Sequence, residues 1–355
     1  MGLFSKKKKY QIEPTFLCVF EDDTVSSFEP LHYFHPIWEL LHGATPRYHR
    51  FALSFSTLTA TVACREDIAT IVELEDTTPM NVFEPGDYLF VNARVAHPER
   101  LAEIVELPGN ATFYMQDSVI VAARIKLTEQ HTGNIFEYLK ETRGSIPNDE
   151  ISIKLYSHIW ELMQDNGGAL QRDAAIFPLG KQEGTLYSTT VMMNPKHIFM
   201  APGSVAEPGV VLDASNGPIV IDHDVTIMAN SVLKGPIYVG HDTVIKAGAT
   251  IYGGTTIGHT CKVGGEVEDS VMLPYSNKQH HGFLGHSYIG SWCNLGAGTT
   301  TSDLKNTYSP IKVQLNEACI DTHSLFIGTL MGDHVKTGIN SMLNSGTILG
   351  PISNV

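Results

Sequence analysis

The residues best suited to chemistry in this 355-residue sequence stand close together in its second half. Three histidines, His280, His281 and His286, lie within seven residues, and the sequence Asn-Leu-Gly-Ala-Gly-Thr follows at 294–299. An imidazole with a pKa of about 6.5 can accept a proton from a reacting group at neutral pH. Backbone N–H groups in a glycine-rich turn can approach an oxyanion, because no side chain blocks them. The segment is therefore a candidate site for proton transfer.

The same residues have other interpretations, which stay open at this point. Three close histidines could bind a metal ion, but no carboxylate or cysteine stands at ligand spacing beside them, so we expect no metal site. A loop histidine is commonly a surface residue. Asn294 could turn the chain rather than bind a ligand, and Gly296 and Gly298 could serve the geometry of the turn alone.

A six-residue repeat supplies the elements that must position this segment. Aliphatic residues recur every six positions, at Ile221, Ile227, Leu233, Val239, Ile245, Ile251, Ile257 and Val263. Small or β-branched residues stand four positions later, at Val225, Ser231, Ile237, Thr243, Ala249, Thr255, Cys261 and Val267. A period of six fits neither an α-helix nor a single strand. It predicts a parallel β-helix, in which three hexads form one triangular coil around the aliphatic side chains.

Breaks in this repeat predict where binding surfaces lie. The register resumes at Ile289 and Leu295, and it can be followed through Val313, Cys319, Leu325, Met331, Thr337, Leu343 and Leu349. Two interruptions, residues 264–288 and roughly 300–310, are expected to project from the coil. Insertions in a solenoid commonly carry the binding surface. The three histidines fall in the first interruption.

The first half of the chain has the pattern of a mixed α/β domain over residues 10–190, with a basic tail at 1–9 before it and the β-helix at 191–355 after it. Runs of apolar residues predict buried strands at 16–20, 89–92 and 118–123. Helical spacing predicts a helix over 153–164 that ends at Gly167 and Gly168.

Composition excludes several classes of protein. With 43% hydrophobic and 17% charged residues, the chain is not intrinsically disordered. A net charge of −14 argues against nucleic acid as a partner. No run of about eighteen apolar residues is present, and no apolar segment follows the basic tail, so we expect neither a membrane partner nor a signal peptide. Five scattered cysteines fit reduced thiols in a cytoplasmic protein.

The motifs around the histidines resemble those of a known enzyme family. Residues 280–285 form a His-x-x-aromatic-aliphatic-Gly motif, and 294–299 form an Asn-aliphatic-Gly-Ala-Gly-Thr motif. Both resemble the acetyltransferase domain of the bifunctional UDP-N-acetylglucosamine pyrophosphorylase/glucosamine-1-phosphate N-acetyltransferases. The segments KVGGEVE, YSNK, GFLGHSYIG, NLGAGT and LKNTY resemble a related group of sugar nucleotidyltransferases. The hexads resemble those of left-handed β-helix acyltransferases, which implies a left-handed coil and a homotrimer.

This resemblance implies an N-acetyltransferase that uses acetyl-CoA and acts on an amino sugar or a sugar phosphate. His280 would be the general base that takes a proton from the attacking amine, which is protonated at neutral pH. The acceptor would contact Asn294, Phe283, Lys278, Lys262, Asp303 and Lys305. Acetyl-CoA would contact Ala297, Gly298 and Ile339.

The chain also departs from the family pattern. The family holds the sugar phosphate and the nucleotide with an arginine and a lysine on preceding coils, and these positions fall near Tyr252 and Ser270. No arginine occurs after Arg172, so the repeat offers no guanidinium for a bidentate phosphate contact. The remaining candidates for phosphate binding are the nearby lysines Lys246, Lys262, Lys278 and Lys305.

Two alternatives complete the set of functional hypotheses. Residues 20–22 and 31–43 resemble the start of the nucleotidyltransferase-like domain in the same group, so the first half could be a sugar-1-phosphate nucleotidyltransferase with the β-helix as a trimerisation scaffold. It would need Mg²⁺ on carboxylates such as Asp22, Asp23 or Asp117, but it has no glycine cluster to hold phosphates. The third hypothesis is a non-catalytic protein that binds a sugar nucleotide or serves as a scaffold.

Overall fold

The computed structural model describes residues 11–75 and 80–355 and divides the chain into two compact units. The first unit comprises residues up to Val25, 34–39 and 47–157; the second comprises 26–33, 40–46 and 158–355. The basic tail expected at 1–9 lies outside the described residues. The second unit includes residues 158–190, which the sequence assigns to the first domain.

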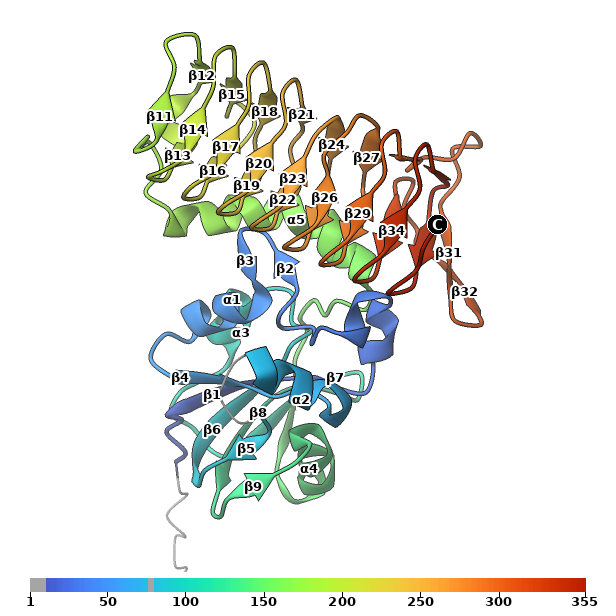
Figure 1. Ribbon diagram of the computed structural model, residues 1–355. Coiled ribbons are helices and arrows are strands. Elements are labelled where there is room, and N and C mark those ends of the chain that lie inside the picture. The colour runs from blue at the N-terminus through green and yellow to red at the C-terminus, as the bar shows by residue number, and fades with distance from the viewer. Residues whose placement is uncertain (1–10, 76–79) are drawn as a thin grey trace, which may run out of the picture. The chain divides into compact units, whose positions relative to one another are not determined.

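The first unit is built on a six-stranded mixed sheet (Figure 1). In spatial order its strands are β10 (Asn148–Glu150), β7 (Thr112–Gln116), β8 (Val119–Leu127), β6 (Gly86–Asn92), β1 (Phe16–Phe20) and β4 (Thr59–Val62). Its helices are α1 (Arg47–Ser54), α2 (Glu66–Glu75), α3 (Pro98–Ile104) and α4 (Ile135–Thr142), and a short pair is formed by β5 (Val82–Phe83) and β9 (His131–Thr132). Phe20, Phe90 and Phe113 are fully buried in its core. The three strands predicted from apolar runs are confirmed.

The second unit is a left-handed parallel β-helix whose strands form three faces. The first face contains β11 (Thr185–Leu186), β14 (Val205–Ala206), β17 (Thr226–Ile227), β20 (Val244–Ile245), β23 (Lys262–Val263), β26 (Asn277–Lys278), β29 (Asn294–Leu295) and β34 (Lys336–Thr337). The second contains β12 (Val191–Met193), β15 (Val211–Asp213), β18 (Val232–Lys234), β21 (Thr250–Ile251), β24 (Glu266–Glu268) and β27 (Phe283–Gly285), and the pair β30 (Thr300–Thr301) and β35 (Met342–Leu343) follows. The third contains β13 (Ile198–Met200), β16 (Ile219–Ile221), β19 (Ile237–Val239), β22 (Thr255–Ile257), β25 (Val271–Met272), β28 (Tyr288–Ile289), β33 (Thr329–Met331) and β36 (Thr347–Leu349).

Each coil runs through the first, second and third face in turn, so the β-helix has three corners. We call the turn from first to second face the first corner, that from second to third the second corner, and that from third back to first the third corner. All eight aliphatic residues of the hexads from 221 to 263 are fully buried inside the coil. The small residues four positions later are buried as well. The predicted β-helix and its inward register are confirmed.

The first predicted interruption is wrong, because residues 264–288 stay in the coil. Strands β24, β25, β26 and β27 pair in parallel with the strands of neighbouring coils. Inward residues in this stretch are spaced by four and five, at Val263, Val267 and Met272, because two turns are shorter than in the regular hexads. A change of turn length hides the repeat in the sequence without interrupting the stacking of strands.

The second interruption is longer than predicted. It carries an antiparallel hairpin of β31 (Lys312–Leu315) and β32 (Ala318–Asp321), which Figure 1 shows projecting from the coils. Val313 and Cys319 belong to this hairpin, and Leu325 is 42% exposed, so none of the three continues the inward register. The register returns at Met331. A six-residue spacing across the hairpin was therefore coincidental.

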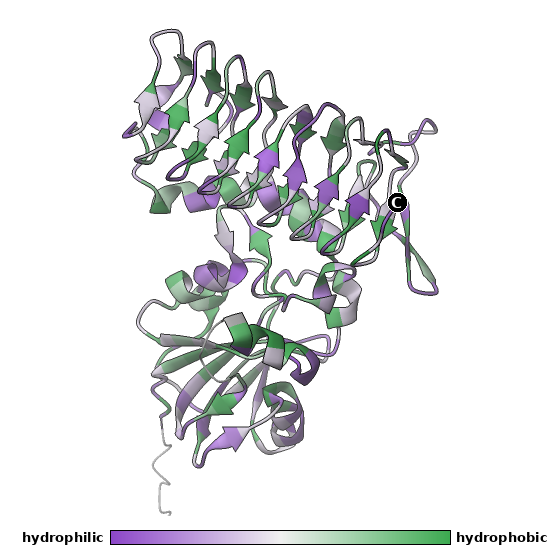
Figure 2. Ribbon diagram, in the orientation of Figure 1, coloured by the Kyte–Doolittle hydropathy of each residue, from purple (hydrophilic) through white to green (hydrophobic). Residues whose placement is uncertain are grey.

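Helix α5 (Ile159–Asp173) packs on the third face of the β-helix, against β19, β22 and β28. Figure 2 shows hydrophobic and hydrophilic residues along it, as expected for a helix with one buried side. The helix starts later than predicted and continues through Gly167 and Gly168, so the predicted end is wrong. A Cβ at Gly167 would lie 3.5 Å from Gly254 Cα, and Asn166 Nδ2 donates to Gly254 O at 2.8 Å. Both glycines therefore lie inside the helix, and Gly167 is on the side that packs against the coil.

The segment at 40–46 forms the short hairpin of β2 (Leu41–His42) and β3 (Thr45–Pro46) and contacts the same unit. The phenol of Tyr288 donates to Leu41 O at 2.8 Å, and Gly43 N–H donates to Asn166 Oδ1 at 2.7 Å. Short 3-10 turns complete the described chain at 25–28, 31–33, 143–145, 174–176 and 195–197. None of the helices in the described part of the chain combines the length and apolar character needed to cross a bilayer.

Candidate functional site

The predicted general base stands on an exposed turn at the first corner of the β-helix. His280 and His281 lie between β26 and β27, and both side chains are exposed. No described residue hydrogen-bonds the imidazole of His280. The backbone of the turn is held, because Gly298 N–H donates to His281 O at 3.2 Å. The position therefore combines a tethered backbone with an imidazole that is open to a ligand.

The residues predicted to contact acetyl-CoA lie on the next coils at the same corner. Ala297 and Gly298 follow β29, and Asn340 N–H donates to Ala297 O at 2.7 Å. Ile339 is 76% exposed beside this contact. The structure thus brings the histidine turn, the Gly-Ala-Gly turn and Ile339 together on successive coils. Gly298 has φ +75°, and a Cβ there would collide with Asn340 Oδ1.

The Gly-Ala-Gly turn has fewer free donors than the sequence suggests. Gly296 N–H donates to Thr337 Oγ1 at 3.0 Å, and Gly298 N–H is used by His281 O. Of the three N–H groups at 296–298, that of Ala297 alone has no acceptor in the described part of the chain. A developing oxyanion could therefore be stabilised here by one backbone N–H, not by three.

Asn294 and Lys262 occupy outward positions on the first face. Asn294 is exposed and is in register with Asn277 on the preceding strand and with Lys336 on the following one. Lys262 is exposed and is in register with Asn277. The result is a column of two lysines and two asparagines. Sequence reasoning missed Asn277 and Lys336, because outward hexad positions accept any polar residue and carry no pattern of their own.

Lys278 does not present a cation to a ligand, so its assignment to the acceptor is not supported by the geometry. The residue is 2% exposed, and its side chain points into the coil. Its Nζ donates to the carbonyls of Gly264 at 2.9 Å, His280 at 3.3 Å and Gly282 at 2.6 Å. Burial lowers the pKa of this ammonium to about 8.

Asp303 is already paired within the chain. Its carboxylate lies 2.8 Å from His286 Nδ1, and Asp269 lies 3.6 Å from the other ring nitrogen. The ring of Phe326 stacks on the imidazole with centroids 5.0 Å apart. Burial opposes protonation of His286, but the hydrogen bond that its ring donates to Asp303 and the nearby carboxylates raise its pKa above the ordinary value. His286 and Asp303 are therefore a coupled pair at the second corner, apart from the His280 turn.

Two further predicted acceptor residues are partly accessible. Phe283 starts β27 on the second face and is partly exposed. Lys305, in the long insertion, is partly exposed and donates from Nζ to Pro310 O at 3.1 Å. A cation that the sequence analysis missed, Lys234, lies on the same face, with Nζ 5.4 Å from the ring centroid of Tyr252. It supplies a positive charge close to where the family pattern calls for an arginine.

In the first unit, the carboxylates proposed for Mg²⁺ differ in their surroundings. Asp22 is buried and accepts from Arg94 Nη1 at 2.9 Å and Asn92 Nδ2 at 2.8 Å. Burial raises its pKa, but the Arg94 guanidinium and the hydrogen bonds outweigh this and lower it overall. Asp23 instead lies 3.9 Å from Lys140, and Asp117 sits in a turn with φ +47°. No group of three metal-ligating side chains occurs within 11–75 and 80–355. The carboxylate of Asp22 is thus already paired with the guanidinium of Arg94.

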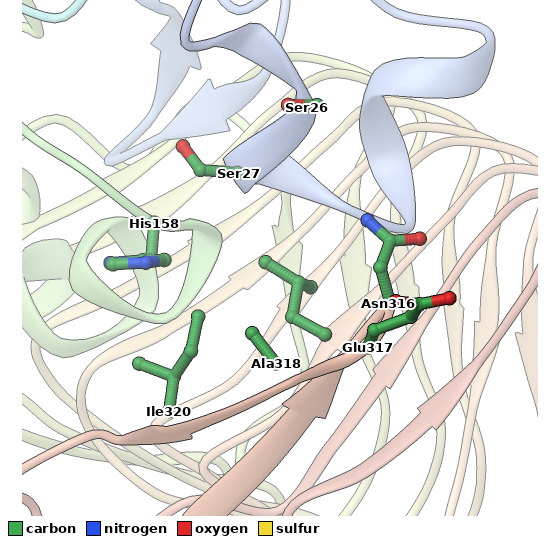
Figure 3. A pocket seen from close by; sticks show the side chains of 8 residues that line it. Ser26, Ser27, His158, Asn316, Glu317, Ala318 and Ile320 are labelled. Atoms are coloured by element: carbon green, nitrogen blue, oxygen red, sulfur yellow. The ribbon is translucent and has the colours of Figure 1, made fainter.

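A cavity of about 640 Å³ lies in the second unit, away from the predicted residues. Figure 3 shows side chains of Ser27, His158 and Ile320 around it. Its full lining is Ser26, Ser27, His158, Leu315, Asn316, Glu317, Ala318 and Ile320. None of the residues assigned to acetyl-CoA or the acceptor lines this cavity.

Comparison with known proteins supports the resemblance noted from the motifs. A family model described as sugar nucleotidyl transferase matches residues 17–182, just under half of the chain. The bifunctional protein GlmU of Methanocaldococcus jannaschii is 33% identical over 85 residues, which is 24% of this chain and 21% of that protein. The bifunctional sugar-1-phosphate nucleotidylyltransferase/acetyltransferase of Sulfurisphaera tokodaii is 31% identical over 96 residues, which is 26% of this chain and 24% of that protein.

These matches span about a fifth to a quarter of the length of the curated relatives. Among solved structures, the acetyltransferase domain of PglB from Neisseria gonorrhoeae in complex with acetyl coenzyme A aligns over 94% of this chain and 95% of its own. The identity is 11% and the TM-score is 0.16, a value too low to support an argument. The chain is thus similar to a family of sugar nucleotidyltransferases in its first half and to bifunctional transferases over a short segment.

Proposed function

We propose that this protein is an N-acetyltransferase that transfers the acetyl group of acetyl-CoA to the amine of an amino sugar or amino-sugar phosphate. One observation carries the proposal: the exposed imidazole of His280 stands on the same corner as the free N–H of Ala297 and the exposed side chain of Ile339. The likeness to bifunctional transferases supports it.

The corner can perform this reaction with its own groups. His280 takes a proton from the acceptor amine, whose nitrogen then attacks the thioester carbon. Ala297 N–H donates to the carbonyl oxygen as it gains negative charge. The new C–N bond forms, the C–S bond breaks, and the leaving thiolate of CoA takes from His280 the proton that the amine lost, which gives the thiol and restores the neutral imidazole. Ile339 and the exposed Met342 provide apolar surface for the thiol-bearing arm of CoA.

The acceptor would lie against outward side chains next to this turn. Asn294 offers an amide that can donate and accept, while Lys262 and Lys305 offer point charges for a phosphate. Asp303 would act through its pair with His286 rather than as a free carboxylate. Following the resemblance, we also propose that the protein is cytoplasmic. We further propose that it forms a homotrimer, and light scattering would test this by measuring the molar mass.

Nucleotidyl transfer by the first unit is the second candidate, and the family match over residues 17–182 favours it. The unit has the sheet expected of such a domain, but Asp22 is committed to Arg94. We therefore rank this activity below acetyl transfer and derive no step through Mg²⁺.

The test is a pair of assays on the full chain. Acetyl-CoA is incubated with amino sugars, with and without phosphate, and free thiol is measured. In parallel, a sugar phosphate and nucleoside triphosphates are supplied, and pyrophosphate is measured. We expect thiol release, and we expect His280→Ala to lower kcat by about 10²- to 10⁴-fold without changing the melting temperature, because the side chain is exposed.

The neighbouring variant His281→Ala is the matched control and should retain activity. Thiol release that His280→Ala leaves unchanged would refute the proposed base. Pyrophosphate without thiol would favour the second candidate, and neither product would favour a non-catalytic binding protein.

A further inference from the structure

An inward position on the first face carries a charged residue where the rest of the column is uncharged. Ile227, Ile245, Val263 and Lys278 are in register there, and Leu295 and Thr337 are in register further along the same face. Lys278 is 2% exposed, and each of its three carbonyl partners is backbone. An ammonium has three N–H groups, so this one is fully satisfied inside the coil. Such burial is costly unless every donor is paired, which indicates a built site for the ammonium.

The shape of the coil explains how the ammonium fits. On neighbouring coils the inside of the first corner is filled by a small residue, Ala249 or Thr299, and both are buried. The turn between Val263 and Val267 is too short to supply such a residue. Lys278 fills the space instead: a Cβ on Gly265 would stand 2.9 Å from its Nζ, so the glycine leaves room for it.

Two of the three carbonyls belong to the turn that carries the general base. Lys278 Nζ bonds the carbonyl of His280 itself and that of Gly282, which closes the turn. The third bond ties both to Gly264 on the preceding coil. Because the imidazole of His280 is exposed, its position depends on how the backbone of the turn is held. The Lys278 bonds hold it from inside the coil, together with the bonds from Gly298 N–H to His281 O and from Glu266 N–H to Gly282 O.

We propose that Lys278 is a positioning residue for acetyl transfer: its buried ammonium holds the 280–282 turn from inside the coil and so fixes His280 against the acceptor. The proposal rests on the proposed function of His280. A displacement of about 1 Å at a reacting group can cost about 100-fold in rate. Loss of the Lys278 bonds, which we call the anchor, should therefore lower kcat and leave substrate binding unchanged.

The experiment compares three variants of the full chain by steady-state acetyl transfer. Lys278→Met keeps the length and removes all three donors; Lys278→Gln restores two N–H groups without the charge. Ser231→Ala is the matched control, because Ser231 Oγ bonds the carbonyls of Met228 and Lys246 at the same corner of an earlier coil. We expect Lys278→Met to lower kcat about 100-fold with both KM values within about twofold, and Lys278→Gln to recover about tenfold of that loss.

A second measurement separates failure of the anchor from failure of the proposed function. Backbone amide exchange over residues 279–283 should accelerate in Lys278→Met and stay unchanged in Ser231→Ala. If the wild-type chain acetylates no acceptor, the proposed function fails and the exchange rates still test the anchor. Wild-type kcat in Lys278→Met, an equal loss of kcat in Ser231→Ala, or unchanged exchange in Lys278→Met would each overturn the proposal.

Discussion

Histidines stand at the third and the first corner of the same β-helix, and they are stacked on one another at the third corner but not at the first. At the third corner, His223, His241 and His259 stand one coil apart and their rings stack, with centroids 4.7 and 4.5 Å apart and planes within 6°. On the next coil Tyr275 meets His259 edge to face, at an interplanar angle of 86°, and Tyr275 in turn stacks on Trp292. At the first corner, His280 and His281 have no stacked partner among the described residues and face outward.

The difference follows from the regularity of the coils. A strict repeat of eighteen residues per coil places the three histidines directly above one another. Each ring therefore packs against the ring on the next coil instead of facing a ligand. His223 and His241 also pair with Asp224 and Asp242, at 3.0 and 2.8 Å. At the first corner the turn between Val263 and Val267 is shorter than the others, so the histidine turn has no turn of equal length on the preceding coil. Irregularity in a solenoid therefore creates available side chains.

The largest effect should come from adding a methyl group at matched glycines of the first corner. Gly298 and Gly209 have φ of +75° and +78°, and in each a Cβ would collide with the Oδ1 of an asparagine on the next coil, Asn340 or Asn230. Gly→Ala at either site should lower the free energy of unfolding by about 1–3 kcal/mol. Only Gly298→Ala should also raise KM for acetyl-CoA, by about tenfold or more, because only that turn borders the site.

Chemical denaturation and steady-state kinetics on both variants check this prediction. An equal change in KM for both would mean that the first corner as a whole, rather than the Gly-Ala-Gly turn at 296–298, governs activity. That result would break the contrast between regular and irregular coils.

A smaller effect should follow from removing a ring at the third corner. His241→Ala deletes two stacked contacts, each worth about 0.5–1.5 kcal/mol beyond area burial, and should lower the free energy of unfolding by about 1–2 kcal/mol. Acetyl transfer should not change. His281→Ala is the control, since an exposed, unstacked residue should change stability by less than about 0.5 kcal/mol. A His241→Ala protein as stable as wild type would show that the stack is incidental.

The smallest effect concerns the titration of the stacked rings. The hydrogen bond that His223 donates to Asp224 raises the pKa of His223, so the stabilising contribution of this pair is present at low pH and is lost as pH rises through that pKa. Burial and then the nearby charge of His241 lower the pKa of His259, so its contribution is gained as pH rises toward about 6.5. Imidazole NMR should find the two rings titrating on opposite sides of this value.

The variant His241→Phe keeps a ring in the stack and removes its charge. It should move the pKa of His259 upward, closer to that of an ordinary histidine. No movement would assign the whole shift to burial.

Regular hexads made most of the β-helix predictable, and the strands of the first unit followed from apolar runs such as 16–20. Prediction failed where spacing changed. Residues 264–288 looked like an insertion because inward residues there are four or five apart, and the hairpin at 312–321 looked like coil because two residues happened to be six apart. A search for a fixed period finds coils whose turns have equal lengths, but it misses strands that stack although the turns between them differ in length.

Site prediction succeeded and failed for a related reason. The motif at 280–285 and the turn at 296–298 stand close in sequence, and the structure places them on successive coils at one corner. Lys278 pairs with backbone carbonyls and Asp303 pairs with the imidazole of His286. These partners are set by the stacking of coils, so no local sequence pattern predicts them. From sequence alone, Lys278 near His280 is interpreted as a phosphate-binding residue. The structure shows that its side chain points into the coil instead.

The sequence by itself determined that residues 221–263 form a β-helix, that a histidine and a glycine-rich turn share one region, and that no arginine follows Arg172. Folding placed Lys278 inward and Arg94 beside Asp22, and among the N–H groups at 296–298 it left that of Ala297 without an acceptor in the described part of the chain. The physical reason is that periodicity is a property of one chain segment, whereas the pairing of a donor or a charge depends on segments brought together by folding.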